Sequence, residues 1–84
     1  MLLIDESNFY NARVGSYVYL KNEWFTVSMI SGHTYSLFLD RKFIDAYRFN
    51  TNQYRLPIDL KLSCYLAETE EEILQAKLSY VANQ

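Results

Sequence analysis

Three stretches in the first half of the chain have the composition of β-strands. The stretches Val14–Leu20 and Trp24–Ile30 are rich in β-branched and aromatic residues, and Thr34–Leu39 is a third run of this kind. Short polar segments at 21–23 and 31–33 separate the runs, and their residues are typical of tight turns. The pattern therefore predicts a three-stranded antiparallel meander.

Alternation within the second run indicates which of its side chains face the core. Successive side chains of a strand point to opposite faces, so Phe25, Val27 and Met29 share one face. We expect this face to lie on the core. Ile30 falls on the opposite face, and Trp24 either shares that face or lies at the strand end.

The segment Asp40–Asn50 is compatible with two structures. Phe43, Ile44 and Tyr47 follow the spacing of a short helix, which the first residue of the segment would cap and the last would end. As a strand, the same segment would place the acid Asp45 on its apolar face. We therefore favour a short middle helix.

Apolar and polar residues alternate strictly from Leu56 to Leu66. Such alternation is typical of a strand with one face on the core and one toward water. Pro57 cannot donate a ladder hydrogen bond, so it should mark an edge or the start of the strand. We expect Leu60 to lie at the centre of the core face, and Cys64 on the same face to be inert packing.

The C-terminal segment Thr69–Val81 is predicted to be a helix. Thr69 and Glu72 match the capping box, and the acids at 70–72 suit the positive end of the helix dipole. The helix carries a narrow apolar stripe that can cover the sheet or pair with a second copy of the chain. The predicted oligomer contacts on this stripe are Ile73, Leu78 and Val81.

Together these elements predict one small α+β domain over residues 1–84. Its expected architecture is a small antiparallel β-meander, an SH3-like sheet or partly open barrel, with a short middle helix and a C-terminal α-helix. The run from 14 to 39 has the general look of a small SH3-like meander, an analogy of pattern that carries no functional residues with it. Because 84 residues bury only a modest core, we also expect a homo-oligomer, most simply a dimer.

Composition excludes several classes of protein. The single cysteine, Cys64, rules out an internal disulfide and a cysteine zinc cluster, and it fits a reducing compartment. Only four residues precede Asp5, without a basic region, so the chain start does not match a signal peptide. The longest uncharged run, Trp24–Leu39, is too short and too polar to span a bilayer. We expect a cytoplasmic protein without membrane contact.

Candidate chemistry is sparse. His33 is the only histidine, and its neighbours in sequence offer no carboxylate to orient its ring. One histidine cannot build a two-histidine metal site, and two glycines are too few for a phosphate-cradling loop. We interpret His33 as a hairpin turn residue and expect no catalytic residues, no metal, no cofactor and no enzymatic activity.

Charge is distributed unevenly along the chain. Residues 41–61 carry five basic and two acidic side chains, whereas the chain from Glu68 onward carries four acids and one lysine. The middle of the chain is therefore mildly basic. A strong nucleic-acid binder normally has a larger basic excess.

A set of aromatic and basic side chains remains as the candidate site. A small core cannot easily satisfy eight tyrosine hydroxyls, and tyrosine with arginine is typical of protein interfaces. We therefore predict a small non-catalytic interaction protein that binds and occludes a protein partner, of inhibitor, adaptor or phage and mobile-element accessory type. The alternative is a nucleic-acid or nucleotide-binding module that uses the basic, Tyr-rich middle segment. The predicted partner-binding residues are Tyr17, Tyr19, Trp24, Arg41, Lys42, Tyr47, Arg48, Tyr54 and Arg55.

Overall fold

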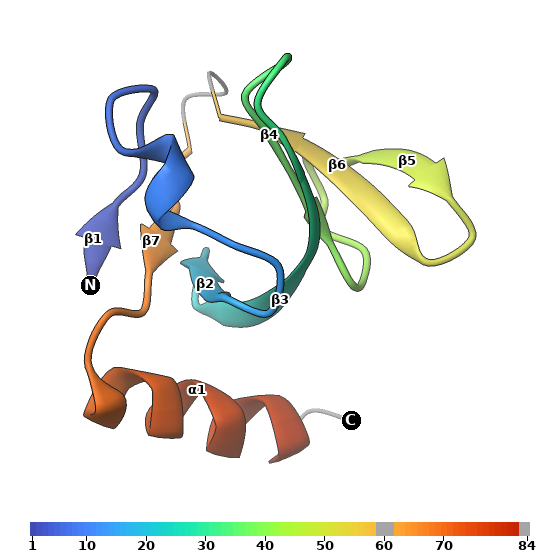
Figure 1. The fold of residues 1–84 in the computed structure, drawn as a ribbon. Coiled ribbons are helices and arrows are strands. Elements are labelled where there is room, and N and C mark those ends of the chain that lie inside the picture. Colours follow the sequence, from blue (N-terminus) through green and yellow to red (C-terminus); the bar gives the residue numbers. More distant parts are fainter. Residues whose placement is uncertain (59–61, 83–84) are drawn as a thin grey trace.

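One long strand, β3 (Glu23–Ser31), joins the two halves of a seven-stranded antiparallel sheet (Figure 1). The computed structural model describes residues 1–58 and 62–82, with side chains up to residue 80. The strand order is β1-β7-β2-β3-β4-β6-β5. The other strands are β1 (Leu2–Leu3), β2 (Tyr17–Leu20), β4 (Ser36–Leu39), β5 (Tyr47–Asn50), β6 (Gln53–Pro57) and β7 (Tyr65–Leu66).

The predicted meander is confirmed as β2-β3-β4, and both β2 and β4 are shorter than the predicted strands. Lys21 and Asn22 form the tight turn between β2 and β3, with φ angles of 41° and 68°. Two consecutive positive φ values are what a two-residue hairpin turn of the favoured twist requires. A short 3-10 helix, η1 (Phe9–Asn11), precedes the meander.

A β-bulge in β3 changes which side chains face the core. The pairing with β4 shifts register between Val27, which lies opposite Leu39, and Met29, which lies opposite Phe38. One extra residue reverses the alternation that follows it. Ile30 therefore packs on the main core, and the expectation that Met29 belongs to the core face is wrong.

Both halves of the sheet contribute to one main core, because the sheet curls around it (Figure 1). Phe9 from η1 is fully buried there, with Phe25 from β3. The largest fully buried side chains are Phe9, Phe25, Leu20, Leu37, Leu39, Leu56, Val18, Val27 and Cys64. The core therefore draws on residues far apart in sequence.

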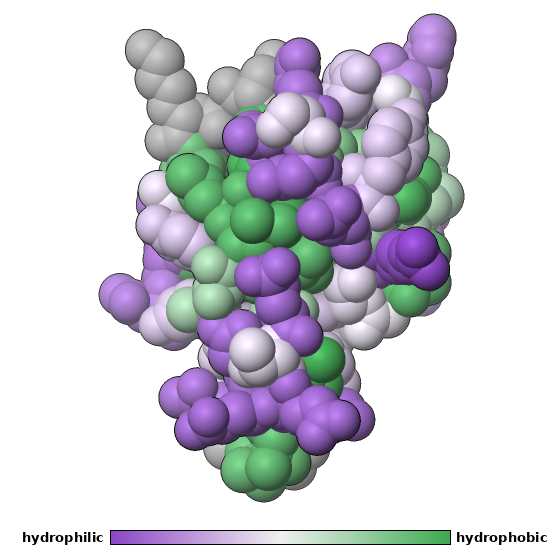
Figure 2. Space-filling model, turned by 60° about the vertical axis from the view of Figure 1, so that its left-hand side comes forward, coloured by the Kyte–Doolittle hydropathy of each residue, from purple (hydrophilic) through white to green (hydrophobic). Residues whose placement is uncertain are grey.

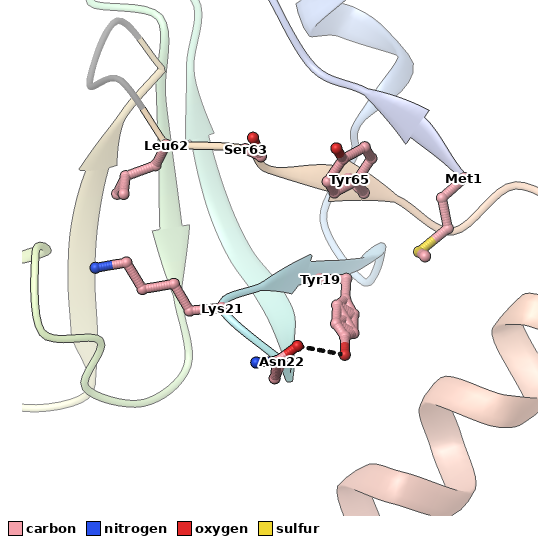
Figure 3. Close-up of a pocket in the computed structure, with 7 residues that line it drawn as sticks. All are labelled: Met1, Tyr19, Lys21, Asn22, Leu62, Ser63 and Tyr65. Carbon is pink, nitrogen blue, oxygen red and sulfur yellow. Dashed lines mark hydrogen bonds between the residues drawn. The ribbon is translucent and has the colours of Figure 1, made fainter.

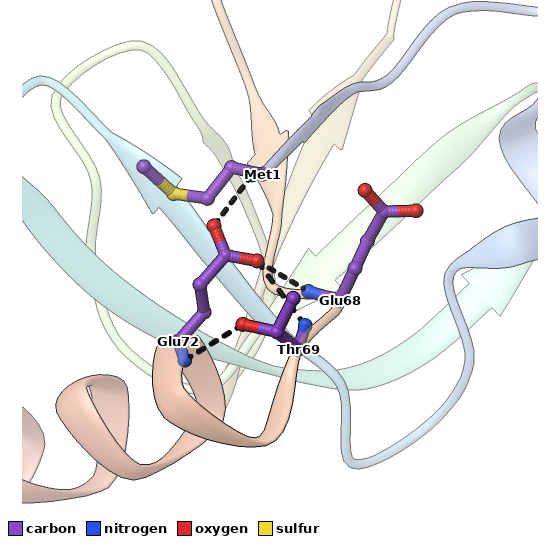
Figure 4. A network of polar contacts seen from close by, with 4 residues as sticks. All are labelled: Met1, Glu68, Thr69 and Glu72. Atoms are coloured by element: carbon purple, nitrogen blue, oxygen red, sulfur yellow. Dashed lines mark hydrogen bonds and ion pairs between the residues drawn. The ribbon is translucent and has the colours of Figure 1, made fainter.

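Helix α1 (Glu70–Ala82) packs on the outer face of the sheet, opposite the main core (Figure 1). A second, smaller cluster of Trp24, Ala67 and Ala76 forms this contact. The predicted capping box is present: Thr69 Oγ1 accepts from the N–H of Glu72 at 3.1 Å, and Glu72 Oε1 accepts from the N–H of Thr69 at 3.2 Å (Figure 4). No helix among the described residues combines the length and apolar character needed to cross a membrane.

The predicted middle helix at 40–50 is wrong, because this segment forms bends and then strand β5. The Asp40 carboxylate, expected to cap the helix, instead accepts from the N–H of Thr26 at 3.1 Å. Phe43 enters the main core, so it no longer belongs to a helical stripe. The objection to a strand also disappears, since β5 begins after Asp45, which is exposed and pairs with Lys21.

The predicted single strand Leu56–Leu66 is also wrong. Its ends belong to β6 and β7, which lie in different halves of the sheet. β6 ends at Pro57, after which the N–H of Ile58 donates to the carbonyl of Tyr35 at 2.9 Å. The apolar positions at both ends still reach the core, and Cys64 is buried as expected. Leu60 lies outside the described residues.

Candidate functional site

Three of the predicted partner-binding residues lie beneath α1. Trp24 is only 6% exposed, and Tyr17 and Tyr19 pack against the same small cluster. The Tyr19 and Trp24 rings meet edge to face with centroids 4.9 Å apart, and Tyr17 meets Tyr80 of the helix at 6.5 Å. These aromatic side chains therefore hold the helix on the sheet.

Arg41 is also engaged within the chain. Its guanidinium lies over the ring of Phe25 at 4.7 Å and over that of Tyr80 at 5.4 Å. It donates to the carbonyl of Trp24 and forms an ion pair with Glu23 at 3.5 Å. Arg41 thus links β3 to α1, and its guanidinium interacts mainly with groups of the same chain.

Tyr47, Arg48, Tyr54 and Arg55 come together on the β5–β6 hairpin, far from α1 (Figure 1). Tyr47 lies directly opposite Arg55, and Arg48 lies directly opposite Tyr54. Residues opposite one another share a face of the sheet. Each face of the hairpin therefore carries one tyrosine and one arginine.

Phe49 belongs with this group, although it is not among the partner-binding residues predicted from the sequence. Its ring packs edge to face on Phe38 with centroids 4.8 Å apart, while 56% of the residue stays exposed. Tyr47 on the same strand is 58% exposed. The strand alternative for 40–50 is the signal that points to Phe49, because it places Phe49 on the same face as Tyr47. The helical spacing of this segment does not include Phe49. We call Tyr47, Arg48, Phe49, Tyr54 and Arg55 the hairpin surface.

The hairpin surface is basic and lies at an open edge of the sheet. β5 is the outermost strand, and all four of its residues are exposed. No acidic residue occurs from 46 to 58, and Arg48 forms no ion pair within the described part of the chain. Arg55 is held in place by a 3.0 Å hydrogen bond from its Nε to Ser36 Oγ. Lys42 is exposed but lies in the bend before β5.

A hollow lies between β2 and β7 (Figure 3). It has a volume of about 420 Å³ and is open to solvent. Tyr19 Oη donates to Asn22 Oδ1 at 3.4 Å, and Lys21 points away from both to an ion pair with Asp45 at 2.9 Å. The side chains of Tyr19 and Lys21 point in different directions (Figure 3).

The structure describes both potentially reactive side chains that the sequence analysis named, His33 and Cys64. His33 is exposed in the turn between β3 and β4, as interpreted. Burial raises the pKa of the Cys64 thiol to about 12, so it stays protonated at neutral pH. In the part of the chain that the structure describes, no three His, Cys, Asp or Glu residues cluster in a way that could hold a metal ion.

The predicted oligomer contacts point in different directions. Ile73 faces the sheet and packs against the Trp24 cluster. Leu78 is 65% exposed, and Leu74, one turn before it, is also exposed. Figure 2 shows apolar surface on the underside of the helix. The side chain of Val81 lies outside the described part. Only Leu78 of the predicted set is therefore placed on a free surface.

Comparison with protein-family models, with curated proteins and with solved structures finds no match for this chain. A function is therefore inferred from its own side chains.

Proposed function

We propose that the protein is a small non-catalytic interaction protein that binds and occludes a protein partner through the hairpin surface. The observation that carries this proposal is the pair of aromatic side chains on the outermost strand, Tyr47 and Phe49, each more than half exposed. Arg48 lies between them in sequence, and Arg55 lies opposite Tyr47. Inhibitor, adaptor and accessory roles all use such a surface.

Energetics favour burial of this surface in a complex. Removing an exposed aromatic ring from water is worth roughly 2 kcal/mol at about 25 cal/mol per Å² of apolar area. Tyrosine and arginine are enriched among the residues that dominate binding energy. Phe49 already packs on Phe38, and Arg55 already donates a hydrogen bond to Ser36. These two side chains therefore lose less conformational entropy when a partner binds.

This surface is smaller than the one predicted from sequence. Tyr17, Tyr19, Trp24 and Arg41 are left out, because their rings and charge hold α1 on the sheet. Lys42 stays at the margin as an exposed positive charge. The proposal therefore separates residues that build the domain from residues that are free to contact a partner.

A nucleic-acid or nucleotide-binding function is the alternative. It has less support, because Arg41 is engaged with Trp24 and Glu23, and Lys21 with Asp45. Fluorescence titration with single-stranded and duplex oligonucleotides at two salt concentrations separates the two functions. Salt-dependent binding that Arg48→Ala weakens would favour the nucleic-acid function.

Four finer features belong to the same proposal. We propose that the curled sheet is an SH3-like, partly open barrel, and its support is that β3 pairs in both halves of the sheet. The chain forms one domain and works in the cytoplasm, which a single reduced cysteine suits. Two copies pair through the outer face of α1 around Leu78, which leaves the hairpin surface free.

The test compares capture by three immobilised proteins: the wild type, Tyr47→Ala/Phe49→Ala and the control Tyr10→Ala. Tyr10 in η1 is 62% exposed, so the control removes a similar ring elsewhere. We expect chemical crosslinking and mass spectrometry to identify a partner that the wild type and the control retain and the double variant loses at least tenfold. A partner held equally by all three, or no specific partner, would contradict the proposal. Thermal melts confirm that each variant is folded.

A further inference from the structure

We infer that the hairpin surface takes an acidic, extended segment of its partner, which adds to the sheet as a new strand beside β5. This inference rests on the proposed function and specifies the partner chemistry for that surface. It follows from the open edge, the placement of the two arginines and the cost of pairing β5 with a second copy.

The open edge gives the binding mode. Among the described strands, β5 pairs only with β6 and ends the strand order, and all four of its residues are exposed. An edge strand presents unpaired backbone N–H and C=O groups, and an extended peptide can satisfy them by strand addition. The four residues Tyr47–Asn50 span about 13 Å at ~3.3 Å per residue, enough to pair a segment of about four to six residues.

The arginines give the partner its charge. Arg48 lies opposite Tyr54 and so shares its face of the hairpin. Arg55 is the next residue after Tyr54 in β6, so it lies on the other face. Side chains of an added strand alternate between the same two faces. Acidic residues on either face would meet an arginine, and no acid from 46 to 58 competes for that charge.

The same arginine opposes pairing with a second copy. A twofold antiparallel pair of β5 strands would bring the two Arg48 side chains close together at the new ladder, where like charges destabilise the pairing. Arg48 therefore selects against self-association at this edge and favours an acidic segment.

The experiment selects binders from a random linear heptapeptide library displayed on phage, with the wild-type protein as bait. We expect the enriched peptides to be rich in acidic residues, which can lie on either face of the added strand. Fluorescence anisotropy of a synthetic enriched peptide should give a Kd that rises at least tenfold for Arg48→Glu and less than twofold for Arg13→Glu, an exposed arginine before β2. Binding should also slow amide hydrogen exchange in residues 47–50.

Three results would overturn the inference: enriched peptides without acidic residues, equal Kd values for the two arginine variants, or no peptide whose binding depends on Tyr47 and Phe49. None of these touches the proposed function by itself. A folded partner captured through Tyr47 and Phe49, without an acidic extended segment, would keep that function and remove the strand-addition mode.

Discussion

The guanidinium of Arg41 lies over the ring of Tyr80, 5.4 Å from its centroid, and so connects the bend after β4 to the C-terminal helix. The same group stacks on Phe25 at 4.7 Å, where β3 meets the main core. One arginine therefore contacts both the core and the helix. A residue that the sequence suggested for partner binding has a role in holding the domain together.

We predict that Arg41→Ala lowers the free energy of unfolding by about 2 kcal/mol, because it removes two cation–π contacts and the hydrogen bond to Trp24. Arg41→Lys should recover little, since an ammonium cannot reproduce the planar stack. Urea unfolding measures both. The control is Lys42→Ala, an exposed neighbour expected to stay within about 0.5 kcal/mol. Equal effects at the two positions would refute the bridging role.

We predict that Trp24→Ala costs about 3–5 kcal/mol of stability, because the helix loses the centre of its contact with the sheet. Far-ultraviolet circular dichroism during thermal unfolding should show an early loss of helical signal. Trp24→Phe keeps an aromatic ring beside Tyr19 and should cost less. A Trp24→Ala protein that melts within a few degrees of the wild type would mean that α1 holds its place without this cluster.

We predict a Glu72-dependent loss of stability in acid. A hydrogen bond from the amino group of Met1, 2.5 Å away, and the N–H groups of Thr69 and Glu68 lower the pKa of Glu72 from 4.5 to about 2 (Figure 4). A carboxyl whose folded pKa is lowered stabilises the fold fully above its unfolded pKa. This contribution is present above about pH 4.5 and is lost as the pH falls through about 2.

Urea unfolding at several pH values between 6 and 2 tests this dependence. Glu72→Gln should flatten the loss of stability between pH 4.5 and 2, whereas Glu71→Gln, on the exposed side of the same turn, should keep it. Asp5, whose pKa is lowered by the Ser7 hydroxyl, adds the same background slope to all three proteins. Identical pH profiles for Glu72→Gln and the wild type would refute the assignment.

We predict that the wild type is a dimer and that Leu78→Glu converts it to a monomer, because a charge would enter the apolar helix contact. Light scattering with in-line size exclusion should give about twice 10.0 kDa for the wild type and 10.0 kDa for the variant. Gln75→Glu adds the same charge to another exposed helix position and should stay dimeric. A wild-type mass of 10.0 kDa at every concentration would contradict the dimer.

The parts of the fold that depend on local signals could be predicted from the sequence. The turn at Lys21 and Asn22 and the capping box of Thr69 and Glu72 are set by residues adjacent in the chain. The β3 bulge could not be predicted, since it follows from pairing with β4 and leaves no mark in the alternation. The division of Leu56–Leu66 between two halves of the sheet depends in the same way on distant partners.

The candidate site shows the same limit. Composition identified aromatic and basic side chains correctly as types, but it could not separate Trp24, buried under α1, from Tyr47, exposed on β5. The helical interpretation of 40–50 also left Phe49 out of the predicted site, whereas strand β5 exposes it beside Tyr47. Burial depends on which element packs on which face, and this packing is set by the tertiary structure and not by the local sequence.

Hydrogen–deuterium exchange of the chain, free and bound to its crosslinked partner, tests the central claim most directly. We predict that binding slows amide exchange within residues 47–55 by at least tenfold, while exchange in α1 and at residues 9–13 stays unchanged. Protection confined to α1 or to the hollow between β2 and β7, with β5 exchanging as in the free protein, would contradict the hairpin surface as the binding site.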